Sequence, residues 1–273
     1  MKNATSLLRH GLSGLVCLLV AAAAVAADRG ADGKFSKRTS SHFVLFQDVD
    51  IDETAGLRGS RHFEDEVLAA LEAAYRGVDQ RLGMRPRRPI TVSVWDPVLF
   101  DQNFSGLFRF PTAGFYGDSI HVRGATTVDA RLIRVLNHEL VHASFHAESP
   151  SLVLPAWFNE GVAEWFEAVA TGHPQLAPSQ VAYLQRLARG GALYSLAQLS
   201  GPNFGDLGTN GASAAYLQSR AFIDFLASQH GERRVREMVR DVVRSGDIDR
   251  AFRRRFRSDV EELEGRWRRS LGG

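Results

Sequence analysis

Two histidines four residues apart, with a glutamate directly after the first, constrain this chain more than any other feature. They stand in the segment Asn137-His138-Glu139-Leu140-Val141-His142. In an α-helix, residues four apart lie on one face and about one turn apart, so both imidazoles can reach the same point. Glu139 is rotated by about 100° from His138 and faces the same region. The segment therefore predicts a helix that presents two imidazoles and one carboxylate to a single site.

Two imidazoles are only part of a zinc site, because catalytic zinc uses three protein ligands and leaves a fourth position for water. His146 continues the same helical face, but eight residues place it about 12 Å along the axis from His138. A chain that turns to supply a third histidine needs Gly at position 145 and His at 148. The sequence has Phe145 and Glu148 there. The third ligand must therefore come from elsewhere in the chain.

A second element provides a suitable carboxylate. Glu160 lies 18 residues after His142, in the run Trp157-Phe158-Asn159-Glu160-Gly161-Val162-Ala163-Glu164-Trp165. Pro155 favours the start of a new helix at this point, and that helix carries Glu160 and, one turn later, Glu164. The competing interpretation is a buried helix whose histidines only hydrogen-bond their neighbours.

These two motifs resemble those of the gluzincin metallopeptidases, the clan that contains thermolysin and the aminopeptidase N group. The run from Asn159 to Trp165 is similar to the Asn-Glu-Gly-x-Ala-Glu-aromatic run of the aminopeptidases. The resemblance implies one Zn²⁺ ion held by His138, His142 and Glu160, with Glu139 as the general base. It also places Glu164 where thermolysin-type enzymes keep a carboxylate that hydrogen-bonds a zinc-ligating histidine.

The end of the chain, Val260 to Trp267, resembles the end of small exported peptidase-MA-like proteins of bacteria, a similarity that covers about residues 41–271. It implies a gluzincin-like α+β fold. We expect an N-terminal α/β lobe, residues 41–150, to contribute the sheet and the zinc helix. A C-terminal helical lobe, residues 151–273, would contribute the third ligand, and the active-site cleft would lie between the lobes.

The first 27 residues read as a cleavable secretory signal, because Lys2 and Arg9 precede an apolar run and a cluster of small residues. The apolar run is shorter than the ~20 residues that span a bilayer, so we expect no stable membrane insertion after cleavage. Cys17 lies inside this run without the small residue before it that a bacterial lipoprotein needs. We therefore expect an exported protein, periplasmic or secreted, that begins with a flexible leader at residues 28–40.

Removal of the signal segment changes the cysteine content and the net charge of the chain. It leaves 246 of the 273 residues and takes away the only cysteine, which excludes thiol chemistry and internal disulfides. It also removes two of the 33 basic residues, so 31 basic residues balance 31 acidic ones. A neutral chain does not favour nucleic acid as a partner.

Hydrophobic periodicity and turn residues predict the remaining elements. We expect a turn or short helix in the phenylalanine-rich residues 100–110 and loops at 50–60 and 201–211. Strands are predicted at 42–46 and 90–95, and helices at 63–82, 127–147, 155–171, 179–189, 214–229, 232–244, 247–256 and 258–271.

Two further expectations follow from the resemblance. Residues 114–122 read as a hairpin or edge strand, which in gluzincins borders the cleft and pairs with extended substrate. The alternative is a plain sheet edge. His121, within this segment, is not assigned to the metal. Aminopeptidase-type gluzincins also place a tyrosine hydroxyl near the developing oxyanion. Tyr216 is the candidate, with Tyr194 and His230 as weaker ones and a core-packed tyrosine as the alternative.

The sequence thus predicts an exported zinc metallopeptidase that hydrolyses peptide or protein substrates. The same apparatus polarises any carbonyl, so a zinc hydrolase of a non-peptide or cell-wall amide is one alternative. The other is a non-catalytic envelope binding module that keeps the fold. The chain lacks the Gly-x-Met-Glu-Asn segment with which aminopeptidases hold a substrate amine, so endo- and exopeptidase action both stay open.

Overall fold

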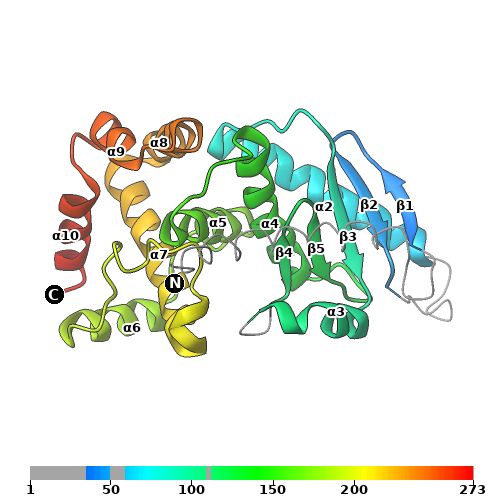
Figure 1. Ribbon diagram of the computed structural model, residues 1–273, viewed down its shortest axis with the longest axis horizontal. Helices are drawn as coiled ribbons and strands as arrows, with labels where there is room; N and C mark the ends of the chain where they lie inside the picture. Colours follow the sequence, from blue (N-terminus) through cyan, green and yellow to red (C-terminus); the bar gives the residue numbers. More distant parts are fainter. Residues whose placement is uncertain (1–34, 50–58, 109–111, 273) are drawn as a thin grey trace, which may run out of the picture.

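A computed structural model of the chain describes residues 35–49, 59–108 and 112–272. A mixed sheet with its helices comes first in this part of the chain, and a helical region follows (Figure 1). The α+β class is therefore confirmed. The signal segment and residues 28–34 lie outside the described residues.

The sheet has five strands in the order β1-β2-β3-β5-β4. The three central strands are parallel, and the two outer strands run antiparallel to their neighbours. The strand predicted at 90–95 and the hairpin predicted at 114–122 are both confirmed, and β4 is one of the two edge strands. The strands are β1 (Ser36–Thr39), β2 (Phe43–Gln47), β3 (Ile90–Trp95), β4 (Gly114–Tyr116) and β5 (Ile120–Arg123).

The strand β1 corrects one expectation. Residues 36–39, which we expected in a flexible leader, pair with β2. Their side chains are Ser, Lys, Arg and Thr, and alternate ones are exposed. An outer strand needs backbone partners more than apolar side chains, so this sequence carries no hydrophobic pattern that predicts it.

The helices occur where periodicity predicts them, but two of them begin earlier than predicted. The helix predicted at 63–82 begins at Gly59, inside the loop predicted at 50–60. The helix predicted from residue 214 begins at Gly208, because Ala212 is buried in the core although Thr, Asn and Gly favour a loop. The helices are α2 (Gly59–Leu82), α3 (Pro97–Phe104), α4 (Ala130–Glu148), α5 (Ala156–Ala170), α6 (Pro178–Arg189), α7 (Gly208–His230), α8 (Glu232–Ser245), α9 (Ile248–Phe256) and α10 (Val260–Ser270), with short 3₁₀ turns at Ser105–Leu107 and Gly205–Leu207.

The helices α4 and α5 occupy the middle of the molecule. Figure 1 shows the sheet at one end, α6, α9 and α10 at the other, and α4 and α5 between them. α4 packs on β4, β5 and α2, whereas α5 packs on α4 and α7. One continuous hydrophobic core runs from the strands through both helices to α10. The central helices are therefore held by packed elements on both sides.

His121 belongs to a separate aromatic cluster on the other face of the sheet. Its Nδ1 accepts a hydrogen bond of 3.0 Å from Trp95 Nε1, and its Nε2 lies 2.9 Å from Ser119 Oγ. Phe104 and Phe115 pack against the same ring. Burial lowers the pKa of His121 to about 4, so the ring is a neutral core histidine.

The helices α5 and α7 pack closely at Gly161. A Cβ at this position would lie 2.8 Å from the backbone oxygen of Ser219. Because this contact is with the backbone of Ser219, rotation of a side chain cannot relieve it. Glycine is therefore required for these two helices to pack at their observed distance.

We expect Gly161→Ala to destabilise the protein by about 1–3 kcal/mol, the usual cost of overpacking. Gly265, inside α10, is a matched control because a Cβ there would meet only the flexible end of Arg269 at 3.5 Å. Gly265→Ala should instead stabilise by about 1 kcal/mol, from its better helix propensity. Urea unfolding of both variants measures the difference, and equal stabilities would contradict the close packing.

No helix within the described ranges combines the length and the apolar character needed to cross a membrane.

Candidate metal centre

α4 carries the two histidines on a helix that is fixed at its start and along its length. Asp129 caps the helix by accepting a hydrogen bond of 2.7 Å from the backbone N–H of Leu132. Leu136, Leu140 and Val141 are fully buried beside the motif. The backbone that carries the two imidazoles is therefore well held on its core side.

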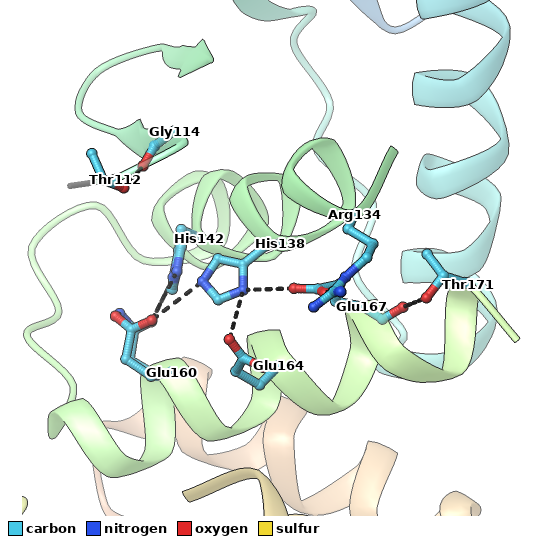
Figure 2. Close-up of polar contacts among 10 residues, drawn as sticks. Thr112, Gly114, Arg134, His138, His142, Glu160, Glu164, Glu167 and Thr171 are labelled. Carbon is cyan, nitrogen blue, oxygen red and sulfur yellow. Dashed lines mark hydrogen bonds and ion pairs between the residues drawn. The ribbon is translucent and has the colours of Figure 1, made fainter. Parts of the chain in front are cut away.

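α5 brings the third side chain to the same place. Pro155 precedes the helix, and Trp157 and Phe158 in its first turn are buried in the core. The backbone N–H of Trp157 is also bound to the carbonyl of Leu199, at 3.1 Å. These contacts fix the start of α5, so Glu160 in the next turn points toward α4 (Figure 2).

The three predicted ligands come together. Glu160 Oε2 lies 3.3 Å from His138 Nε2 and 3.5 Å from His142 Nε2. Ligand atoms about 2.0–2.1 Å from a tetrahedral zinc ion are roughly 3.3–3.4 Å from one another. The three side chains thus form a candidate metal site, and two imidazoles with one carboxylate are a donor set that catalytic zinc uses.

The outer nitrogens of both rings also have partners. His142 Nδ1 lies 3.1 Å from Asn159 Oδ1, and His138 Nδ1 lies 3.3 Å from Glu167 Oε2. Glu164 Oε1 is farther from His138 Nδ1, at 3.9 Å, which is longer than a hydrogen bond. An acceptor on Nδ1 keeps the proton there and leaves Nε2 free to bind a metal.

Glu167 therefore lies closer to His138 Nδ1 than the predicted Glu164 does. The sequence contained a signal for it, because Glu160, Glu164 and Glu167 follow one another at helical spacing and share one face of α5. Periodicity places both later carboxylates near His138. It does not say which one reaches the ring, because that depends on the angle between α4 and α5.

The charges of the site favour a cation among the ligands. Burial lowers the pKa of an imidazole and raises that of a carboxylate. Here the mutual contacts outweigh burial: hydrogen bonds with Glu160 and Glu167 raise the pKa of His138 well above its usual value, and the charge of Glu160 raises that of His142. The same pairing lowers the pKa of Glu160 far below its usual value. A divalent cation would supply the positive charge that these groups favour.

The site forms part of a cleft with a volume of about 1050 Å³. The edge strand β4 lines this cleft together with α4, α5 and α7, so the predicted position of the strand beside the site is confirmed. Leu107 and Val153, two exposed apolar residues, also lie along it.

Glu139 and Tyr216 both line the cleft. Glu139 is 6% exposed, and burial raises its pKa even though His138 and His142 oppose the shift. Tyr216 is half-buried and packs edge-on against Phe204, at 5.1 Å between ring centres. Burial raises its pKa first, and the charges of Glu160, Glu164 and Glu139 raise it further, so its hydroxyl stays protonated and can donate.

The other candidate residues lie away from the ligands. His146 is exposed at the cleft and packs edge-on against Tyr116, whereas Glu148 pairs with Arg244 at 2.6 Å. Tyr194 and His230 do not line the cleft. His230 packs against Phe256 instead.

Two histidines and a glutamate at a cleft beside the sheet form a candidate metal centre of the kind found in metallopeptidases. Residues 70–273 match the Peptidase MA superfamily, and because this match covers most of the chain, the chain belongs to that superfamily. The resemblance drawn from the two motifs is thereby confirmed. An uncharacterised protein of Bacillus subtilis (strain 168), YhcO, is 22% identical to it over 200 residues. The aligned region covers 67% of this chain and 58% of that relative's length.

Proposed function

We propose that this chain is an exported, zinc-dependent peptidase of gluzincin type. The observation that carries the proposal is the spacing of the three ligand atoms, 3.3 and 3.5 Å from the shared carboxylate oxygen to each imidazole. Membership of the Peptidase MA superfamily supports peptide bonds as the substrate class. The signal-like first 27 residues support export.

His138, His142 and Glu160 would hold the metal. Bound zinc supplies a Lewis acid that polarises a carbonyl and brings the pKa of a water ligand to about 7. Two imidazoles and a single carboxylate would favour zinc over magnesium or calcium, which prefer six or more oxygen ligands. Asn159 and Glu167 keep the two imidazoles in the tautomer that ligates through Nε2.

Glu139 is the general base in this proposal. It follows the first ligand directly and faces the cleft, where its carboxylate takes the proton of the attacking water. It then delivers this proton to the leaving amine. A buried carboxylate with a raised pKa suits this exchange, because an effective acid–base group has a pKa close to the working pH.

In this proposal, the Tyr216 hydroxyl donates a hydrogen bond to the carbonyl oxygen, which becomes negative as the carbonyl carbon is attacked. We expect Tyr216→Phe to lower kcat by about 10²-fold, the low end for loss of one such donor, with little change in KM or in zinc content. Steady-state kinetics of the zinc-loaded variant test this. Tyr194→Phe is the control. An unchanged kcat in Tyr216→Phe would show that Tyr216 only packs in the core.

The proposed activity is tested on the purified, zinc-loaded protein with a broad peptide library and with peptidoglycan fragments in parallel. We expect peptide products only, lost on chelation and restored by zinc. Products from peptidoglycan alone would assign the protein to cell-wall amides. No turnover in fully loaded protein would favour a binding module. Export is tested by N-terminal sequencing of this protein isolated from cell fractions. A cytoplasmic protein that still carries residues 1–27 would contradict it.

A further inference from the structure

Arg134 lies one helical turn before His138 on α4 and does not touch the ligand atoms of the metal site. Its Nε donates a hydrogen bond of 2.6 Å to Glu167 Oε1. The other oxygen of the same carboxylate, Oε2, lies 3.3 Å from His138 Nδ1 (Figure 2). The carboxylate of Glu167 therefore joins the guanidinium to the imidazole, with one oxygen for each.

The two ends of this bridge have different surroundings. Glu167 is 6% exposed, whereas the side chain of Arg134 is 57% exposed. A buried carboxylate needs partners that replace its water, and a guanidinium is a strong one because both groups are charged. Without Arg134, Oε1 would lose the hydrogen bond that fixes it. The flexible glutamate side chain could then turn away from His138.

Neighbouring carboxylates also favour rotation of the Glu167 side chain away from His138. Glu160 and Glu164 lie on the same face of α5, and Glu164 Oε1 is 3.9 Å from the same imidazole nitrogen. Carboxylate oxygens of Glu164 and Glu167 lie within 4.8 Å of one another. Like charges at this range repel one another. Arg134 is thus the positive group that holds Glu167 among other carboxylates.

We propose that Arg134 is a positioning residue for the metal site: it fixes Glu167, which in turn fixes the ring of His138 with Nε2 toward the metal. This inference rests on the proposed function only in requiring that the site binds zinc. The competing interpretation is a salt bridge that joins α4 to α5 and has no effect on the metal. The two interpretations differ in what they predict for the zinc affinity and for the stability of the metal-free protein.

The experiment measures the dissociation constant for zinc by chelator competition in the full chain. The set of proteins is the wild type, Arg134→Ala, Glu167→Gln and the double variant. Loss of an outer partner of a metal-bound histidine typically costs 10- to 100-fold in affinity. We expect Arg134→Ala to weaken zinc binding by about 10-fold and Glu167→Gln by at least as much. The double variant should be no weaker than Glu167→Gln alone, because Arg134 acts through Glu167.

Two further variants separate positioning from general effects. Arg131 is exposed on the same helix, three residues earlier, so Arg131→Ala removes the same charge without touching Glu167. We expect it to change the zinc dissociation constant less than twofold. Arg134→Lys keeps the charge and N–H donors without the planar guanidinium, and should recover part of the lost affinity.

Thermal unfolding of each metal-free variant completes the test. A lower unfolding temperature for Arg134→Ala with a zinc dissociation constant equal to that of Arg131→Ala would leave only a salt bridge, and so would overturn the inference. Additive losses in the double variant would overturn it as well. If the wild type binds zinc but cleaves no peptide, the proposed function fails while the role of Arg134 is still decided by the zinc affinities.

Discussion

Glu139→Gln is expected to retain about one zinc ion per chain and to lose peptide hydrolysis by about 10²- to 10⁴-fold in kcat, the usual contribution of a general base. The substitution keeps the size of the side chain and removes its ability to take a proton. Because Glu139 points into the cleft beside the ligands without being one of them, metal binding should persist. Metal analysis and steady-state kinetics on the same sample separate the two effects.

Glu148→Gln provides the matched control for this experiment. Glu148 lies at the end of the same helix and pairs with Arg244 at 2.6 Å, outside the ligand cluster. We expect its activity to stay within twofold of the wild type. Full turnover in Glu139→Gln would show that another group takes the proton, and the base would have to be sought elsewhere in the cleft.

The second large effect concerns the metal itself. Glu160→Gln should weaken zinc binding by more than the roughly 10- to 100-fold lost with an outer partner, because an uncharged amide replaces the one anionic ligand. His138→Ala should lose the metal altogether. Chelator competition measures both, and activity should fall in proportion to the zinc that is lost.

Glu164→Gln is the control that the structure offers for Glu160. Glu164 lies one turn later on the same face of α5 and lines the same cleft, but its carboxylate is not within hydrogen-bond distance of either imidazole. We expect a smaller loss of zinc affinity than in Glu160→Gln. An unchanged zinc content in Glu160→Gln would show that another group supplies the third ligand.

The parts of the site that the sequence predicts are those set within one helix. His138 and His142 share a face of α4 because of the helical repeat, and Glu160 lies near the start of a second helix that Pro155 predicts. The contact between His138 and Glu167 depends instead on how two helices cross. Side chains along the whole interface determine that angle, so neither residue spacing nor the resemblance that implied Glu164 shows which carboxylate lies nearer to the ring.

The same distinction explains the fold. The strand at 90–95 and the helix predicted at 63–82 have strong apolar periods. The strand has its predicted limits, and the helix ends where predicted but begins at Gly59. The strand β1 has no such period, since its stability comes from backbone pairing with β2. The early start of α7 likewise depends on the burial of Ala212 against the rest of the core. Both are tertiary effects, which local sequence does not encode.

The contact of Gly161 with Ser219 has a consequence for how specificity can diverge in this scaffold. Glu160 precedes that glycine directly, and Tyr216 lies three residues before that serine, so one helix pair sets the separation of the carboxylate and the hydroxyl. The cleft wall formed by Asn203 and Phe204 belongs to the connection that leads into α7. Substitutions in that connection can therefore reshape the region that receives substrate side chains while the reactive groups keep their separation.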